Sequence, residues 1–287
     1  MKKGLATERS TEMKSITNSV GHVFFVTSWG YAGDHWFSWF VKALNSHPEI
    51  LCYLANEGSR PKYFPEERSR AERPDLVRFC RFLADIGMTY EAIGDCYSYR
   101  PTMMSPIREK WEGLVPIVQL TRHPVAWLNF HVDWRSRNMR MLGGEWGPIQ
   151  HEFDKACNHD LFKSLDLLPY DLSDIEVWAT YQGMERLNDV VADLDTGIRH
   201  YPLERVVFEP SLFREIAGFL TSNRVTFDDE ILARVYSHVW RTFRGEERVD
   251  ANPKRLLAKW PEWKHIAFEK IVSKTTMKAF QSLGYVI

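Results

Sequence analysis

The chain has 287 residues and a formal net charge of −1, with 37 lysines and arginines against 38 aspartates and glutamates. Residues of opposite sign are mixed along the sequence and form no blocks, which argues against a nucleic-acid-binding surface. An α/β protein of this length often folds around one sheet. We therefore expect a single domain over 19–287, preceded by a loosely ordered segment over 1–18.

The four cysteines, Cys52, Cys80, Cys96 and Cys157, are widely spaced and include no C-x-x-C pair. Such spacing is typical neither of a disulfide framework nor of a structural zinc site, so we expect reduced thiols, a cytoplasmic location and no metal. The N-terminal sequence M-K-K-G-L-A-T-E-R-S lacks the apolar run of a signal peptide, and the chain has no stretch of about 18 apolar residues. These features predict no membrane contact.

Short apolar runs alternate with helical periodicity along the chain. The expected strands cover 22–27, 50–54, 92–95, 115–121 and 205–209. The expected helices cover 34–44, 75–86, a segment from 122 onward, 175–194, 211–220, 228–243 and 268–283. A polar segment over 56–73 is expected to be a loop, and weak patterning over 135–174 predicts an irregular insertion. This alternation indicates an α/β fold in which helices cover both faces of a parallel sheet.

The first expected strand leads into a turn that reads V-T-S-W-G-Y-A-G-D-H-W-F over 26–37. Backbone N–H groups and the positive end of a helix dipole make such a strand-to-helix turn suitable for binding an anion. The turn matches neither G-x-x-x-x-G-K-[ST] nor G-x-G-x-x-G. Without its neighbours in the sequence, it does not identify a ligand.

Four further motifs accompany this turn in chain order. N-S-H-P-E-I ends the first helix, I-V-Q-L-T-R-H-P-V-A-W joins a strand to a helix, L-E-R-V-V-F-E precedes P-S-L-F-R-E-I-A-G-F-L, and S-L-G-Y lies near the C-terminus. Together they resemble the sulfotransferases that use 3′-phosphoadenosine 5′-phosphosulfate (PAPS). The resemblance covers most of 22–286. It implies a P-loop-like three-layer fold, with a central mostly parallel sheet flanked by helices, PAPS as co-substrate and no metal.

The resemblance also implies which residues bind PAPS. Gly33, Asp34, His35 and Trp36 fall on the family's G-T-T-W, which wraps the 5′-phosphosulfate, and Arg122 falls on the arginine that holds the 3′-phosphate. Ala32 replaces a serine, while Asp34 and His35 replace two threonines. Asp34 is suited to cap the helix, and a protonated His35 would supply positive charge.

Two positions depart further from the family's pattern. Tyr31 stands where the family carries its catalytic lysine or arginine, and Phe130 stands where a serine is expected beside the 3′-phosphate. Asn129 or His131, which flank Phe130, would supply a polar contact after a shift of one residue. The cations that we consider as replacements for the missing one are Lys254 and Arg255 in the C-terminal third, Arg60 and Lys62 in the polar loop, and Arg100 after the third strand.

A hydroxyl or amine acceptor needs a base within hydrogen-bonding reach of the proton that it loses. Glu57 and Asp95 follow predicted strands on the face expected to carry the cofactor, and His35 is a third candidate. A turn or cap role is the simpler alternative for each carboxylate. The peptide C-Y-S-Y-R over 96–100 follows a strand end and is our candidate wall of the acceptor pocket.

These features predict an enzyme that transfers a sulfuryl group from PAPS to a hydroxyl or amine of a small molecule or glycan. A homodimer is compatible with them. Two alternatives stay open. One is a catalytically impaired, sulfotransferase-like nucleotide-binding protein, because Tyr31 lacks charge; the other is a divergent P-loop phosphotransferase, which the missing P-loop lysine disfavours.

Overall fold

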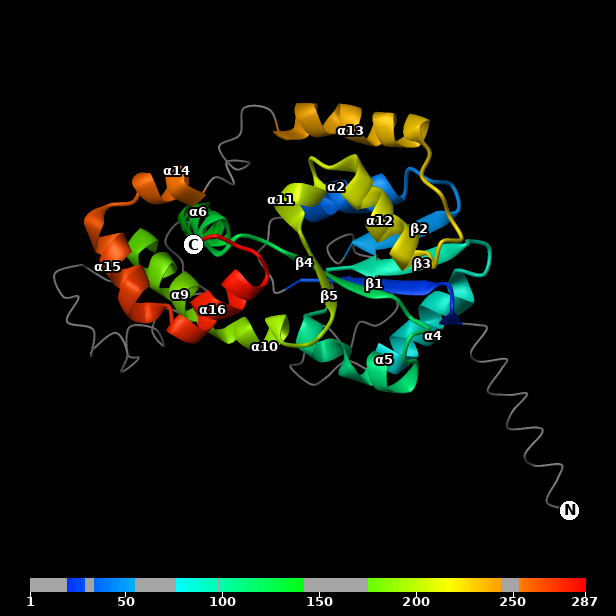
Figure 1. Ribbon diagram of the computed structural model, residues 1–287, viewed down its shortest axis with the longest axis horizontal. Coiled ribbons are helices and arrows are strands. Elements are labelled where there is room, and N and C mark those ends of the chain that lie inside the picture. Colours follow the sequence, from blue (N-terminus) through cyan, green and yellow to red (C-terminus); the bar gives the residue numbers. More distant parts are fainter. Residues whose placement is uncertain (1–19, 29–33, 55–75, 98, 142–174, 244–252) are drawn as a thin grey trace, which may run out of the picture. The chain divides into compact units, whose positions relative to one another are not determined.

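The computed structural model describes residues 20–28, 34–54, 76–97, 99–141, 175–243 and 253–287. The chain divides into two compact units, one over 1–30, 34–121 and 196–244, and the other over 31–33, 122–195 and 245–287. The first unit contains the sheet and the second is helical in its described parts (Figure 1). The single domain expected over 19–287 stays a prediction.

Five parallel strands form the sheet of the first unit in the order β2-β3-β1-β4-β5. The strands are β1 (Val23–Thr27), β2 (Ile50–Leu54), β3 (Ala92–Cys96), β4 (Ile117–Thr121) and β5 (Arg199–Pro202). Its helices are α2 (Asp34–Leu44), α4 (Leu76–Ile86), the 3₁₀ helix η2 (Pro101–Met104), α5 (Ser105–Lys110), α11 (Leu203–Val206), α12 (Pro210–Leu220) and α13 (Asp229–Phe243). Every residue of β1, β3 and β4 is buried, as expected of a parallel sheet covered on both faces.

Side chains alternate between the two faces along each strand, and this alternation assigns the helices to layers. Val23 and Phe25 of β1 belong to an apolar cluster with residues of α4 and α5, such as Phe79 and Ile107. In Figure 1, α2 and α12 lie on the opposite side of the sheet from α4 and α5. The predicted P-loop-like three-layer fold is thereby confirmed.

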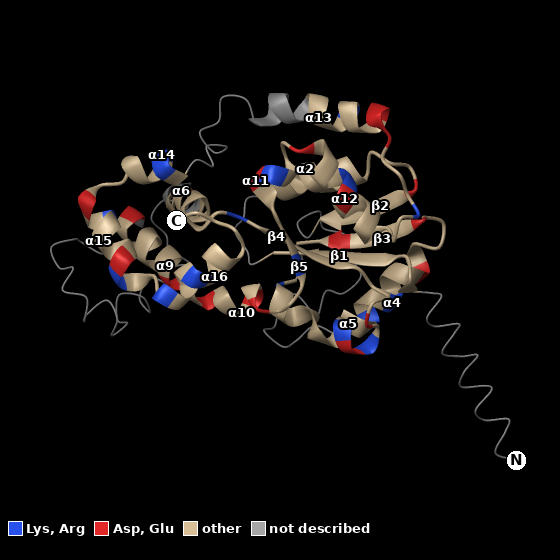
Figure 2. Cartoon of the chain, in the orientation of Figure 1, with Lys and Arg blue, Asp and Glu red and all other residues tan. Residues whose placement is uncertain are grey.

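The handedness of the crossovers explains this arrangement. The connection from β1 to β2 runs toward one edge of the sheet, whereas those from β2 to β3 and from β3 to β4 run back toward the other edge. Because parallel crossovers are right-handed, the first connection places α2 on one face and the next two place α4 and α5 on the other. Charged residues lie mainly on the helices, and few lie on the strands (Figure 2).

The strand predicted over 205–209 is wrong. β5 occupies Arg199–Pro202, and the next residues form α11. Leu203, Val206 and Val207 are all buried, and their i, i+3, i+4 spacing fits one face of a helix, although the V-V-F run has the composition of a strand. β5, which reads R-H-Y-P, is an edge strand with a single buried residue, Tyr201, so it lacks the apolar majority that marked the other four strands.

The second unit consists of helices in the described residues. They are α6 (Pro124–Met141), α9 (Ile175–Asp189), α10 (Val191–Leu194), α14 (Pro253–Ala258), α15 (Glu262–Ile271) and α16 (Lys274–Ser282). α6 includes 135–141, the first part of the predicted irregular insertion, and 142–174 lie outside the described residues. Gly183 of α9 packs against α6 so tightly that an added Cβ would lie 2.5 Å from Leu128 and 2.9 Å from His131.

The predicted helix over 268–283 is in fact two helices that meet at Ser273. The Ser273 Oγ caps α16 by accepting a hydrogen bond of 3.1 Å from the Thr276 N–H. Asn188 of α9 fixes this junction, because its amide nitrogen donates to the Ile271 carbonyl and its oxygen accepts from the Ser273 N–H, each at 2.8 Å. The helix predicted over 175–194 is likewise divided into α9 and α10.

Cys52, Cys80 and Cys96 are buried in the first unit. Burial raises the pKa of the Cys80 thiol to about 12. In the part of the chain that the structure describes, the helices are too short or too polar to cross a membrane.

Replacement of Gly94 by alanine tests the packing of β3 against β1. An added Cβ would lie 2.2 Å from the ring of Phe24, which is fully buried and cannot move aside. We expect Gly94→Ala to lower the free energy of unfolding by about 3 kcal/mol, measured by urea denaturation. The matched control is Gly218→Ala in α12, where the Cβ would lie 3.0 Å from the end of the Asn223 side chain and helix propensity improves. Equal effects of the two substitutions would contradict this packing.

Candidate active site

The carboxyl end of β1 is the point at which the crossovers of the sheet change direction. α2 follows β1 on one face, whereas α4 and α5, which follow β2 and β3, lie on the other. Ligands of open parallel sheets bind beyond the carboxyl ends of the strands at such a switch point. Ser28 follows β1 and Asp34 begins α2, so these residues bracket the glycine turn over 29–33, which lies outside the described residues.

Polar side chains lie on one face of the three central strands at this end of the sheet. Thr27 of β1 is paired with Gln119 of β4, and Asp95 of β3 is paired with Phe25, two residues before Thr27. Paired residues of neighbouring strands share a face, so Thr27, Asp95 and Gln119 point to the same side. Each is at most 2% exposed. The sheet thus combines a carboxylate, an amide and a hydroxyl where a ligand is expected.

Two of the buried polar groups have spare hydrogen-bonding capacity. Within the described residues, neither the Ser28 Oγ nor the Gln119 Nε2 has a hydrogen-bond partner. Thr27 differs, because its Oγ1 donates to the Val118 carbonyl at 3.1 Å and thereby ties β1 to β4. Leaving a buried donor without a partner costs about 1–3 kcal/mol, so such donors next to a switch point indicate a ligand or an ordered water.

Asp95, predicted as a catalytic base, is the last but one residue of β3 and is 2% exposed. Its position on the polar face of the sheet is compatible with catalysis. A buried carboxylate close to buried donors is also what a purely structural network would require. Its role as the base stays a prediction.

The peptide after Asp95 carries a strained backbone. Tyr97 has a φ of 71°, and its N–H donates to the Val26 carbonyl of β1 at 2.8 Å. Its ring stacks on Phe37 of α2 with centroids 4.5 Å apart. A left-handed tyrosine costs of order 1 kcal/mol, and such strain occurs often at functional sites. The acceptor wall at Tyr97 stays a prediction. Tyr99, in the same predicted wall, packs its ring against Phe25 and Phe79 in the core.

The residues predicted to bind the phosphosulfate lie partly outside the described residues. This applies to Tyr31, Ala32, Gly33 and the predicted base Glu57, and also to the alternative cations at positions 60 and 62. Asp34 and His35 form the start of α2, although their side chains are not described. Trp36 is 2% exposed, so its indole belongs to the core and only its backbone N–H is suited to contact a ligand.

Arg122, predicted to bind the 3′-phosphate, directly follows β4 in the chain and is the first residue of the α6 segment of the second unit. Its side chain is 3% exposed, and the guanidinium carbon lies 5.2 Å from the centroid of the Phe130 ring. Phe130 is the residue that stands in place of the expected serine. It therefore contacts the predicted phosphate-binding arginine through a cation–π interaction.

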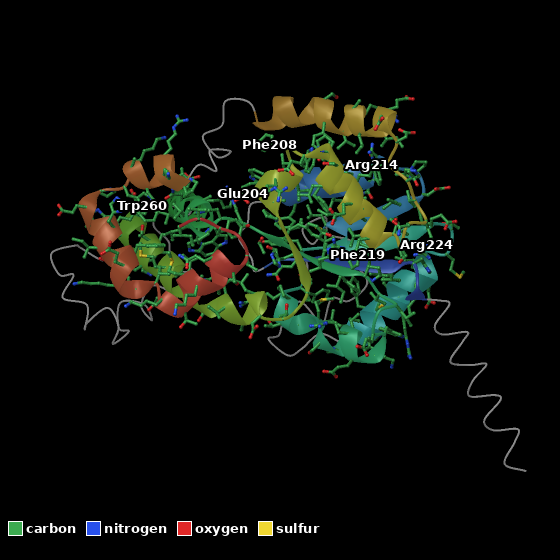
Figure 3. The ribbon with its side chains drawn as sticks, in the orientation of Figure 1. Glu204, Phe208, Arg214, Phe219, Arg224 and Trp260 are labelled. Carbon is green, nitrogen blue, oxygen red and sulfur yellow. The ribbon has the colours of Figure 1, made fainter. Side chains whose placement is uncertain are left out.

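Asn129 contacts α15 and the residues before it. Its Oδ1 accepts hydrogen bonds from the Trp260 Nε1 at 2.8 Å and from the Lys264 Nζ at 3.3 Å. Trp260, labelled in Figure 3, lies between α14 and α15. The side-chain oxygen of Asn129 is thus engaged by two donors, which leaves its NH₂ group as the end suited to contact a phosphate.

The remaining predicted cations are exposed. Lys254 and Arg255 lie on α14 in the second unit, and Arg100 precedes η2 in the first. His131, a reserve for the polar contact, is fully buried; its ring stacks on Trp127 with centroids 5.0 Å apart and its Nε2 lies 3.3 Å from the Gln182 Oε1. These contacts indicate a packing role for His131.

Sequence reasoning missed Ser28, Gln119 and Lys264. Gln119 interrupts the apolar run I-V-Q-L, and a polar residue within a strand buried on both faces was a signal that could have been used. Lys264 occupies the spacing of an apolar stripe, four residues after Trp260 and four before Phe268. Ser28 carries no comparable signal, because serine is common in turns.

No family model matches the chain, and no curated protein matches it. Among solved structures, the chain is similar to the "Sulfotransferase Domain from the Curacin Biosynthetic Pathway", with 13% sequence identity and a TM-score of 0.37. The match covers 92% of this chain and 98% of that one.

His123 connects the start of α6 to the C-terminal residues. Its Nδ1 accepts from the Val125 N–H at 3.2 Å, which caps the helix, and its Nε2 lies 2.9 Å from the Val286 carbonyl. The neutral ring protonated at Nε2 satisfies both contacts. Burial lowers the pKa of His123 below its ordinary value of 6.5, and the bond to Val286 only partly offsets this effect.

The lowered pKa of His123 predicts a loss of stability in acid. The unfolded chain binds the proton more readily, so the full stability is present above pH 6.5 and is lost as the pH falls through the folded pKa. Asparagine would keep the helix cap without titrating. We expect His123→Asn to lower the free energy of unfolding by about 1 kcal/mol at pH 7.5 and to lose less stability than the wild type between pH 6.5 and about 5. Urea denaturation across this pH range measures both effects, and parallel pH profiles would exclude the proposed titration.

Proposed function

We propose that this protein is a PAPS-dependent sulfotransferase acting on a hydroxyl or amine of a small molecule or glycan. The observation that carries the proposal is the position of the residues that bracket the glycine turn. Ser28 follows β1 at the switch point of the sheet and Asp34 begins α2, with buried donors at Ser28 and at Gln119 of the neighbouring strand β4. A phosphosulfate needs such backbone and side-chain donors.

The residues fit an anionic nucleotide in their chemistry. The Ser28 Oγ and Gln119 Nε2 are buried donors without partners in the described residues, and the N–H groups at the start of α2 add the helix dipole. Arg122, with Lys254 and Arg255, would hold the 3′-phosphate. PAPS, when bound, supplies an activated sulfuryl group whose leaving group is a phosphate.

The chain's own residues would orient the acceptor and manage its proton. Tyr97, whose ring is backed by the buried Phe37, is half-buried and would offer an aromatic face beside the end of β3 on which a ring or a sugar face can stack. Asp95 or Glu57 would accept the proton that the acceptor loses as its oxygen or nitrogen bonds to sulfur. In-line placement and charge stabilisation are the principal demands of such a transfer, as they are in phosphoryl transfer.

A second candidate function is nucleotide binding without transfer. It is favoured by Tyr31, which offers one hydrogen bond but no charge at the position of the expected cation. A phosphotransferase is disfavoured, because the lysine that contacts the nucleotide phosphates in P-loop enzymes is absent from the turn. Assay of an acceptor panel with PAPS separates transfer from binding alone.

Substitution of Arg122 tests nucleotide binding. We expect Arg122→Ala to weaken the binding of 3′-phosphoadenosine 5′-phosphate by about 1.5–3 kcal/mol, because a charge-assisted hydrogen bond to the 3′-phosphate is lost. Isothermal titration calorimetry measures the affinity, and thermal unfolding checks that the variant folds. The control is Arg234→Ala at an exposed position of α13, which should bind as the wild type does. An affinity unchanged by Arg122→Ala would refute the role of this arginine.

A pair of isosteric substitutions tests the base. If Asp95 takes the proton from the acceptor, Asp95→Asn should lower kcat by about 10²–10⁴-fold while nucleotide affinity is retained. Glu57→Gln is the matched comparison, since it removes the other candidate carboxylate. A large loss in Glu57→Gln with near-normal turnover in Asp95→Asn would assign catalysis to Glu57 and a structural role to Asp95.

A further inference from the structure

α15 carries a lysine on its buried face. Trp260, Lys264 and Phe268 recur every four residues and are 8%, 5% and 9% exposed, so the lysine occupies a position that the pattern reserves for an apolar side chain. Lysine is almost never buried to this degree without a partner for its charge. The position therefore calls for an explanation beyond packing.

The contacts of Lys264 orient its amine without neutralising it. The Nζ donates to the Asn129 Oδ1 at 3.3 Å and lies 5.0 Å from the centroid of the Trp260 ring. An ammonium has three donors, and the described residues accept this one hydrogen bond. No carboxylate within the described residues forms an ion pair with it; the exposed Glu176 acts on it only through its longer-range charge.

Asn129 and Trp260 fix the position of the amine from two sides. The amide oxygen of Asn129 accepts from both the indole and the amine, so two hydrogen bonds link α6 to Trp260 and to Lys264 of α15. The remaining two N–H groups of the ammonium then have a defined direction, which is the property of a preorganised anion site.

The protonation state of Lys264 is expected to respond to a bound anion. Burial lowers the pKa of Lys264 to about 8, although Glu176 opposes the shift. A bound dianion would favour the ammonium and raise this pKa again, because an opposite charge stabilises the charged form. Anion binding and proton uptake at Lys264 are therefore expected to be coupled.

We propose that Lys264, held in place by Asn129 and Trp260, is an anion-binding residue that contacts a phosphate group of the nucleotide. The inference rests on the proposed function, since it assumes a nucleotide ligand. It also changes the role of Asn129, whose oxygen positions the lysine.

The test combines affinity with proton counting. Calorimetry of 3′-phosphoadenosine 5′-phosphate at pH 8, in buffers of different ionisation enthalpy, gives the affinity and the protons taken up on binding. Because the amine is about half protonated at pH 8, the wild type should take up a fraction of a proton. Lys264→Met should lose this uptake and bind at least about 10-fold more weakly. Lys270→Met, at an exposed position of the same helix, is the matched control and should behave as the wild type.

Two further arms complete the test. Adenosine 5′-phosphate distinguishes the phosphates: an affinity that Lys264→Met leaves unchanged assigns Lys264 to the 3′-phosphate, and a reduced affinity assigns it to the 5′ side. Lys264→Arg keeps the charge without titrating at pH 8, so it should bind the nucleotide without the proton uptake. If Lys264→Met does not fold, Lys264→Arg alone tests whether Lys264 takes up the proton on nucleotide binding.

The outcomes separate the two proposals. Nucleotide binding by Lys264→Met with wild-type affinity and proton uptake would overturn the role of Lys264 and leave the proposed function intact. The same conclusion follows if Lys264→Arg takes up as many protons as the wild type. Failure of the wild type to bind the nucleotide would overturn both.

Discussion

The sheet depends on β1, the central strand, which is buried on both faces and paired with β3 and β4. Right-handed crossovers then force the helix after β1 onto the face opposite to the helices after β2 and β3. The change of direction at the carboxyl end of β1 is a geometric consequence of this topology. It provides a binding position that does not depend on particular side chains, and Ser28 and the start of α2, which bracket the glycine turn in the sequence, lie there.

The two units carry different kinds of buried polar groups. In the sheet unit, Ser28, Asp95 and Gln119 are buried on or next to the three central strands. The helical unit contributes buried positive charge at Arg122 and Lys264, each braced by an aromatic ring. Among these buried groups, the Ser28 Oγ and the Gln119 Nε2 have no hydrogen-bond partner within the described residues, and a buried donor costs stability unless a ligand or an ordered water satisfies it.

The sequence allowed β1, β2, β3 and β4 to be predicted, because most of their residues are apolar. It misplaced β5, since an edge strand with one buried residue has no such apolar majority and the helical V-V-F segment beside it does. At the site, Asp95 and Arg122 could be predicted because each lies at the end of an expected strand. Lys264 was not recognised: its place in the apolar stripe between Trp260 and Phe268 indicates burial, but only the tertiary contact with Asn129 shows how its amine is oriented. Residues 29–33 and 55–75 lie outside the described residues, so the predictions for them remain untested.

The buried thiol of Cys80 can report on the packing of α4 against the sheet. Its thiol lies in the cluster that joins α4 to Phe25 and Ile93. Alkylating reagents attack the thiolate, and with a pKa of about 12 only about one thiol in 10⁵ is ionised at pH 7. Reaction at this cysteine therefore requires α4 to separate from the sheet. The rate at which Cys80 is alkylated therefore measures how often α4 opens locally from the sheet, and the measurement needs no ligand.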